Sequence, residues 1–179
     1  MTTTIGIISD THGLMRPEAI EALRGVDRIV HAGDVGSPEV LEALAEVSPV
    51  TAVRGNIDKG AWAKALPESE VLEIGSVSLY VLHEIGQLDL DPVAADFQAV
   101  IAGHSHNPSV ETRNGVIYLN PGSAGPRRFK LPVALARLKI SGNQITTEVV
   151  RLPSKERDSR RSLGSTRRRG RSARRVDRS

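Results

Sequence analysis

The sequence contains no cysteine among its 179 residues. This absence excludes a disulfide framework, a thiolate zinc site and a cysteine nucleophile, and it fits a reducing compartment, so we expect the protein in the cytoplasm. Aromatic residues make up only 3%, so the core must consist mainly of Val, Ile, Leu and Ala. No apolar run reaches the length of about 18 residues that a membrane span needs, and no signal peptide is evident. Glycine-rich phosphate loops of the Walker or dinucleotide type are also missing.

Positive charge is distributed unevenly along the chain. Residues 151–179 hold 12 of the 24 Lys and Arg but only 3 of the 21 Asp and Glu, which gives them a net charge of +9. Residues 1–150 therefore carry a net charge of −6, although the whole chain has a net charge of +3. The basic character belongs to a tail, and the body of the protein is mildly acidic.

The tail, residues 153–179, is rich in Arg and Ser and has almost no apolar side chains to bury. Ordering it would cost conformational entropy with nothing to offset that cost, so we expect it to be disordered. We therefore divide the chain into a domain of residues 1–152 and this tail. Arg-rich segments can bind nucleic acid through its phosphate charge. The alternatives are a solubilising tail or a segment without selected function, as from a shifted reading frame.

Apolar runs alternate with amphipathic stretches in the first third of the chain. Strands are predicted at residues 3–9, 28–32 and 50–54, and helices at residues 17–23 and 38–47. Both helices begin with Pro, which is favoured at the first helical position. This order is typical of parallel strands joined by crossover helices.

After residue 67 the pattern changes to a succession of short strands. The turn signals Gly75-Ser76, Asn114-Gly115 and Gly142-Asn143 predict three hairpins. A helix is predicted only over residues 91–96, and we expect this half to be mainly antiparallel sheet. The strands are predicted at residues 71–74, 77–82, 99–102, 109–113, 116–120, 133–140 and 144–152.

Residues able to bind metal follow five of the predicted strands. In open α/β sheets ligands gather outside the carboxyl ends of the strands, so these residues can meet at one place. Each motif alone is common as a polar loop or a turn, but their occurrence together, each after an apolar strand, indicates a shared site. The residues are Asp10, His12, Asp34, Asn56, His83, His104 and His106.

The chemistry of these side chains narrows the kind of site. Two carboxylates, one amide oxygen and four imidazoles are too many ligands for one tetrahedral zinc ion and too rich in nitrogen for magnesium or calcium. They can hold two ions if a carboxylate bridges them. Such pairs, roughly 3.5–4 Å apart, serve phosphatases and nucleases. Mixed nitrogen and oxygen ligation suits Mn²⁺, Ni²⁺, Fe²⁺ or Zn²⁺, and we expect Mn²⁺.

These motifs, with Asn120-Pro121-Gly122-Ser123 after them, resemble those of the calcineurin-like metallophosphoesterase superfamily. Within it they are most similar to the small single-domain bacterial and archaeal phosphodiesterases. The resemblance spans residues 3 to about 150. It implies an α/β fold, a four-layer αββα sandwich of two mixed β-sheets flanked by helices, with a dimetal site at one end.

The resemblance also implies a role for each ligand and a mechanism. A hydroxide that bridges the two ions would attack phosphorus in line, in a small phosphate ester. Asn56 and His104 would be catalytic as well as ligands, since they would stabilise the phosphoryl oxygens. One ion would be bound by Asp10, His12 and His106, the other by Asn56, His83 and His104, with Asp34 bridging both.

One position departs from the family's pattern. Many larger relatives have His directly after the motif Asn, where it protonates the leaving group, and close small relatives often have Cys. Ile57 stands at this position and can donate no proton. We therefore expect modest turnover and a preference for diesters with good leaving groups. The remaining histidine, His31, lies in an apolar strand and is predicted to pack in the core or support the site rather than catalyse.

Four questions stay open at the level of sequence. Some members of the superfamily, including a retromer subunit, resemble it in fold but act as interaction proteins, so a noncatalytic metal-binding scaffold is the alternative to an enzyme. Arg127, Arg128 and Lys130 follow the Asn120 motif and can either reach a substrate phosphate or form a solvated basic turn. An oligomer is compatible with the sequence, and nothing in it identifies the physiological substrate.

Overall fold

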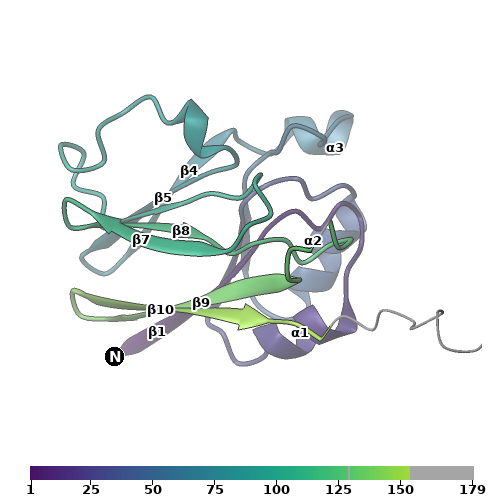
Figure 1. Ribbon diagram of the computed structural model, residues 1–179, viewed down its shortest axis with the longest axis horizontal. Coiled ribbons are helices and arrows are strands. Elements are labelled where there is room, and N and C mark those ends of the chain that lie inside the picture. The colour runs from purple at the N-terminus through teal and green to yellow at the C-terminus, as the bar shows by residue number, and fades with distance from the viewer. Residues whose placement is uncertain (129, 154–179) are drawn as a thin grey trace, which may run out of the picture.

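The computed structural model describes residues 1–128 and 130–153, so the tail from residue 154 onward, where we expect disorder, lies outside the described residues. Two five-stranded sheets are stacked face to face (Figure 1). The strands are β1 (Thr2–Ile8), β2 (Arg28–His31), β3 (Val50–Ala52), β4 (Ser69–Ile74), β5 (Val77–Leu82), β6 (Ala99–Ile101), β7 (Ser109–Arg113), β8 (Val116–Asn120), β9 (Ala134–Ser141) and β10 (Gln144–Arg151). The helices are α1 (Pro17–Leu23), α2 (Pro38–Ala45), α3 (Ala61–Lys64) and the 3₁₀ turn η1 (Ile85–Gln87).

The first sheet has the strand order β10-β9-β1-β2-β3. Its strands β1, β2 and β3 are parallel and are joined by α1 and α2, which confirms the predicted crossover units. The hairpin β9–β10 adds to the other side of β1 in antiparallel register. The last two strands of the chain therefore complete the sheet that the first strand begins.

The second sheet has the order β4-β5-β6-β8-β7. The hairpins β4–β5 and β7–β8 are antiparallel as predicted, but β5, β6 and β8 run parallel to one another. The expectation of a mainly antiparallel second half is confirmed by the three hairpins, since β9–β10 is antiparallel as well, but the parallel strands at the centre of this sheet were not predicted. The physical reason lies in β6, whose three residues are all buried, because an inner strand covered on both faces is typical of parallel pairing.

The helical content of the second half also differs from the prediction. Residues 92–96 form turns instead of a helix, and Asp96 ends them with a left-handed backbone, φ 56°. A segment this short gains too few hydrogen bonds to offset helix nucleation. The four residues of α3 and the three of η1 were not predicted, because such short turns have no hydrophobic periodicity.

The layers confirm an α/β fold with two mixed sheets. Leu23 of α1 and Leu44 of α2 belong to the same buried cluster as Ile29 of β2, so both helices pack on the first sheet. Over the outer face of the second sheet lie η1 and the turns that follow it (Figure 1). Leu88 packs there against a buried cluster that includes Val100 and Val116. Every buried hydrophobic residue in the described part is Ala, Val, Ile or Leu, as the scarcity of aromatics predicted.

The main core lies between the two sheets. Ile5, Ile7 and Val30 of the first sheet face Leu79 and Ile101 of the second. Burial at roughly 25 cal/mol per Å² of apolar surface makes this contact the main stabilising force of the fold. Within residues 1–128 and 130–153, no helix has the length and hydropathy needed to cross a membrane.

Candidate metal centre

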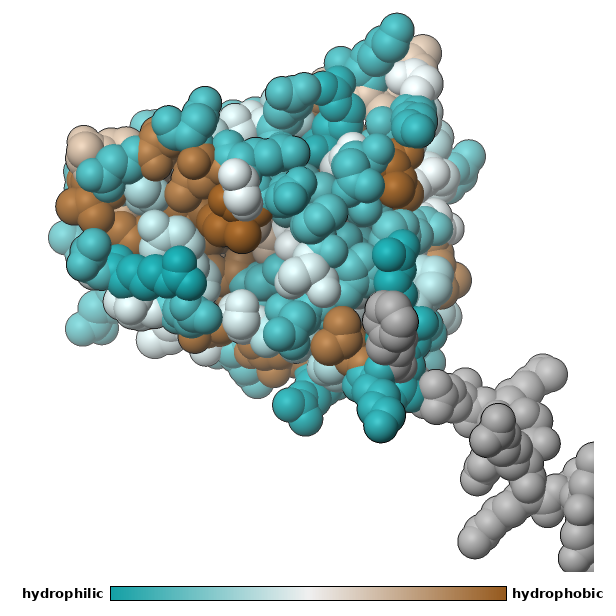
Figure 2. Space-filling view, turned by 45° about the horizontal axis from the view of Figure 1, so that its top comes forward, coloured by the Kyte–Doolittle hydropathy of each residue, from teal (hydrophilic) through white to brown (hydrophobic). Residues whose placement is uncertain are grey.

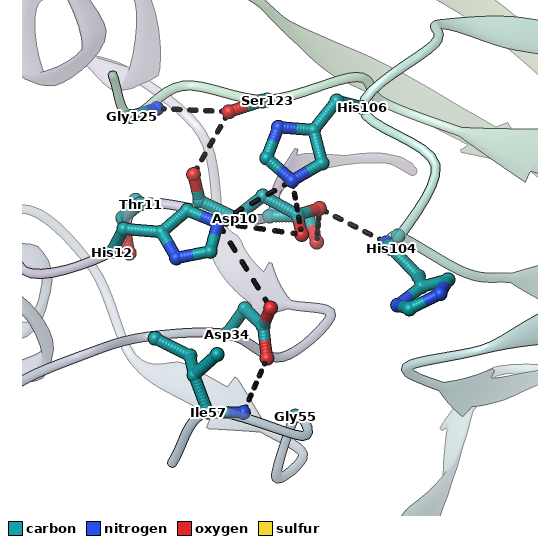
Figure 3. A network of polar contacts seen from close by, with 12 residues as sticks. Asp10, Thr11, His12, Asp34, Gly55, Ile57, His104, His106, Ser123 and Gly125 are labelled. Carbon is teal, nitrogen blue, oxygen red and sulfur yellow. Dashed lines mark hydrogen bonds and ion pairs between the residues drawn. The ribbon is translucent and has the colours of Figure 1, made fainter. Parts of the chain in front are cut away.

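The seven predicted ligands meet where five strands end. Figure 3 shows Asp10, His12, Asp34, His104 and His106 at this place. They follow β1, β2, β3, β5 and β6, whose parallel arrangement brings their carboxyl ends to the same edge of each sheet. Backbone hydrogen bonds join the first two loops, from the Asp10 N–H to the Gly33 carbonyl at 3.0 Å and from the His12 N–H to the Asp34 carbonyl at 3.0 Å.

The ligands sit on a strained backbone. Positive φ is uncommon in residues other than Gly, and it costs of order 1–3 kcal/mol per residue. Seven such residues occur in the described part of the chain, and five of them are predicted ligands. These are Asp10 (φ 55°), His12 (48°), Asp34 (53°), His104 (68°) and His106 (58°). Strain concentrated in this way indicates that the loops are shaped for function.

Asp10, His12 and His106 form one group of facing ligand atoms. The Asp10 Oδ1 lies 3.3 Å from His106 Nε2 and 4.0 Å from His12 Nε2, and the two Nε2 atoms are 3.3 Å apart. Asp10 is fully buried, and its Oδ1 has no hydrogen-bond partner among the described residues. Burial raises the pKa of Asp10. A buried acceptor facing two imidazole nitrogens fits a divalent cation.

The second group forms around Asp34. His83 Nδ1 bonds the Ala32 carbonyl at 2.8 Å, which directs Nε2 toward Asp34 Oδ1 at 3.3 Å and Asn56 Oδ1 at 3.0 Å. His104 Nδ1 lies 3.3 Å from the same Asn56 oxygen. Burial would raise the pKa of Asp34, but hydrogen bonds with His83 and the Ile57 N–H lower it.

Asp34 links the two groups. Its Oδ1 faces His83, and its Oδ2 lies 3.9 Å from His12 Nε2. For His83, burial lowers the pKa, but the bonds to Asp34 and the Ala32 carbonyl raise it overall. Imidazole nitrogens and carboxylate oxygens in two adjoining groups can hold divalent metal.

Asp58 belongs to the motif that begins at Gly55, but the sequence reasoning gave it no role in the site. Its carboxylate is buried and accepts hydrogen bonds from the N–H groups of Gly55 at 2.8 Å, Gly36 at 2.8 Å and Val35 at 3.2 Å. It thereby ties the loop after β2 to the loop after β3 and fixes Asp34 beside Asn56. Asp side chains can bond a backbone N–H three residues earlier, as Asp58 does with Gly55, but the bonds to the other loop have no local signal in the sequence.

Two glycines of the motifs are required by close approach between loops. A Cβ on Gly55 would lie 2.1 Å from the backbone nitrogen and Oδ1 of Asp34. A Cβ on Gly103 would lie 1.9 Å from Ser9 Oγ, which itself donates to Asp10 Oδ2 at 2.7 Å. The glycines therefore allow the strand ends to converge on the two carboxylates.

The chain's residues 3–143 match the model of the calcineurin-like phosphoesterase superfamily domain. The chain belongs to this superfamily. It is 34% identical over 159 residues to a probable metallophosphoesterase of Methanothermobacter thermautotrophicus, covering 82% of this chain and 91% of the relative. A phosphodiesterase of Methanocaldococcus jannaschii is 28% identical over 136 residues, 66% of this chain and 82% of that protein.

A solved structure supports the same assignment. The crystal structure of a predicted phosphoesterase from Streptococcus pneumoniae superposes with a TM-score of 0.65 at 27% identity and covers 84% of this chain and 90% of that chain. The protein is accordingly a metal-dependent phosphoester hydrolase. Its clustered carboxylates and imidazoles could hold the divalent metal.

In this phosphoesterase, His31 contacts Thr11, which lies between Asp10 and His12 in the loop after β1. The His31 ring is fully buried, and its Nε2 donates to Thr11 Oγ1 at 2.9 Å, because the Thr11 hydroxyl itself donates to the Val35 carbonyl. Its Nδ1 has no partner among the described residues. Burial lowers the pKa of His31 to about 3. The expected packing role is confirmed, and Thr11, between two of the ligands, is held in place by this ring.

This buried histidine makes the protein less stable in acid. The unfolded chain takes up a proton at His31 below pH 6.5, whereas the folded chain does so only near pH 3, so stability is complete above 6.5 and is lost as the pH falls. At pH 5.0 the loss is about 2 kcal/mol. Urea unfolding of the metal-free protein at pH 7.5 and 5.0 should show this extra loss relative to His31→Gln. Equal losses in the two proteins would contradict it.

A groove of about 150 Å³ adjoins the site on the outer face of the second sheet. Ser105, which follows His104, and Ile85, which follows Glu84, line it together with Val100 and Tyr118. Figure 2 shows hydrophobic side chains gathered toward the left of the view, whereas its right side is mainly hydrophilic. The groove itself is lined by apolar side chains such as those of Ile85, Val100 and Leu119. An organic substituent on a phosphate bound near His104 would find apolar contacts there.

Proposed function

We propose that this phosphoesterase is a dimetal phosphodiesterase that hydrolyses small phosphate diesters with good leaving groups. The observation that carries the proposal is the pair of facing ligand groups joined by Asp34, whose two oxygens turn to His83 and to His12. Asp10 contributes a buried oxygen without a hydrogen-bond partner among the described residues to the same place. One ion alone would leave part of this ligand set unused.

The ligands would divide between two ions. Mixed nitrogen and oxygen donors favour Mn²⁺, with Ni²⁺, Fe²⁺ or Zn²⁺ as substitutes. When bound, two such ions acidify a water molecule and offset charge on the phosphoryl group. The proposed sets are Asp10, His12 and His106 for one ion and Asn56, His83 and His104 for the other, with Asp34 shared.

Asn56 and His104 would also contact the substrate. The Asn56 Oδ1 lies between the rings of His83 and His104, which leaves the amide Nδ2 to donate to a phosphoryl oxygen. The His104 side chain is 42% exposed, whereas those of His12 and His83 are 12% and 5% exposed, so His104 faces incoming substrate. These donors would stabilise the charge that develops on phosphorus oxygens in the transition state.

The preference for diesters rests on two features. Ile57 is 37% exposed beside Asp34 and provides no proton for the leaving oxygen, so leaving groups that depart as stable anions are favoured (Figure 3). The groove next to Ser105 offers space for one of the two organic substituents that a diester carries. The relative from M. jannaschii is itself named a phosphodiesterase.

Purified protein loaded with Mn²⁺ should hydrolyse bis(p-nitrophenyl) phosphate with a higher kcat/KM than p-nitrophenyl phosphate. Parallel assays with Ni²⁺, Fe²⁺ and Zn²⁺ would rank the metals. If an alkyl monoester proved the best substrate in a panel of monoesters, diesters and cyclic nucleotides, the proposed preference would be wrong.

We place the catalytic unit in residues 1–152. The last described backbone bond of the chain joins the Leu152 N–H to the Val133 carbonyl at 2.8 Å, and the Leu152 side chain is buried. A chain that ends at Leu152 should therefore keep its kcat within about twofold, since no proposed ligand lies beyond it.

Filter binding of RNA at several salt concentrations would test whether the tail binds nucleic acid. Weaker binding by the shorter chain would support docking through the tail, and equal binding would contradict it.

A further inference from the structure

Arg128 brings a positive charge to the edge of the metal centre. Its Nη2 lies 3.4 Å from His12 Nε2, although the two residues are 116 positions apart in the sequence. Arg128 is exposed, and its charge acts together with burial to lower the pKa of His106. The sequence alone did not separate a phosphate-binding Arg from a solvated basic turn at this position.

The loop that carries Arg128 is fixed against the loop after β1. Ser123 Oγ donates to the Asp10 carbonyl at 2.9 Å, and the Arg16 guanidinium donates twice to the Gly125 carbonyl at 3.1 and 3.2 Å. A Cβ on Gly125 would lie 2.4 Å from the Asp10 carbonyl oxygen, so only Gly allows this approach. The loop is therefore attached to the residues that present the ligands, which a freely solvated turn would not need.

The charge of Arg128 is unfavourable at this place without an anion. A guanidinium stays protonated in proteins, and a site that holds divalent cations repels it. The His12 nitrogen that it approaches is a proposed metal ligand, and a lone pair committed to an ion no longer accepts a hydrogen bond. The donors of Arg128 then need another acceptor at the same spot. The oxygens of a phosphate group match the planar fork of the guanidinium.

We propose that Arg128 is a substrate-contacting residue that binds a phosphoryl oxygen at the metal centre. The inference rests on the proposed function, because it takes a phosphate ester as the substrate. Arg128 does not replace the acid that is missing at Ile57, since a guanidinium gives up no proton at neutral pH. Its contribution is to bind the phosphate and to add positive charge on the side of His12.

Binding of inorganic phosphate to the Mn²⁺-loaded protein tests this role without relying on turnover. Isothermal titration calorimetry should show about 10- to 100-fold weaker phosphate binding in Arg128→Ala, as expected for the loss of a charge-assisted pair of hydrogen bonds. Arg128→Lys should recover part of the affinity, because it restores the charge but not the fork. Lys130→Ala removes the same charge two residues away and should bind phosphate like the wild type.

Two results would overturn the proposal. Phosphate affinity of Arg128→Ala equal to that of Lys130→Ala would show that Arg128 does not bind the anion. A loss of Mn²⁺ affinity of more than about fivefold in Arg128→Ala, in a titration without phosphate, would show that it acts by positioning His12. Failure of the proposed function gives a different result, because the wild type would then hydrolyse no diester whatever its affinity for phosphate.

Discussion

Replacing Asp34 with Asn is expected to lower kcat/KM for bis(p-nitrophenyl) phosphate by at least about 1,000-fold in the presence of Mn²⁺, which corresponds to about 4 kcal/mol of transition-state stabilisation. Asp34 has the central position, since its oxygens face His83 at 3.3 Å and His12 at 3.9 Å. Asn keeps the shape and an acceptor for the Ile57 N–H but loses the charge that two cations would share.

The same variant should fold normally. Asn retains the Oδ1 that accepts the Ile57 N–H at 3.1 Å, and it removes one negative charge beside buried Asp10. The Tm of the metal-free variant should therefore not fall below that of the wild type. Metal analysis should show fewer than two Mn²⁺ ions per chain, because the shared ligand is weakened.

Asp89→Asn is the matched control. Asp89 is exposed, and the substitution makes the same chemical change away from the ligands, so activity and metal content should stay at wild-type levels. Full activity of Asp34→Asn would refute the shared-ligand role of Asp34. A wild type that binds two metal ions but hydrolyses no ester in the panel would instead favour the noncatalytic scaffold.

The clustering of the proposed ligands could be predicted from the sequence, because each follows an apolar strand and the ends of parallel strands converge. Asp10, Asp34 and His83 are examples, and the structure brings their side chains together. The sequence could not predict in the same way which sheet each strand joins. The β9–β10 hairpin has an ordinary turn signal, but its pairing with β1 depends on contacts about 130 residues away along the chain.

Support for the ligands was harder to predict than the ligands themselves. Asp58 acts through three backbone N–H groups, and Arg128 reaches His12 only because the Ser123 and Gly125 contacts hold its loop. Such contacts depend on which loops lie side by side, which no local pattern encodes. The left-handed backbone of Asp10 and His104 was also unforeseen, since these residue types do not require it.

Replacing Ile57 with His is expected to supply the missing proton donor. Ile57 is 37% exposed beside Asp34, and its N–H bonds the Asp34 carboxylate, so an imidazole at this position would lie at the open side of the metal centre. The rate for a diester with a sugar alkoxide leaving group, such as a cyclic nucleotide, should rise by about 100-fold, the lower end of what general acid catalysis provides. Hydrolysis of bis(p-nitrophenyl) phosphate should change by less than about threefold, because p-nitrophenolate leaves without protonation.

The decisive measurement is the dependence of kcat on the leaving group. Over a series of diesters with progressively poorer leaving groups, kcat should decline steeply for the wild type and only slightly for Ile57→His, since protonation removes the charge from the departing oxygen. Ile57→Gln is the matched control, because it introduces a polar side chain that cannot act as an acid, and its decline should be as steep as that of the wild type. If kcat of Ile57→His and Ile57→Gln declined equally steeply along the series, leaving-group protonation would not limit this enzyme. The preference for good leaving groups would then have another cause, such as the fit of the aryl group in the groove beside Ser105.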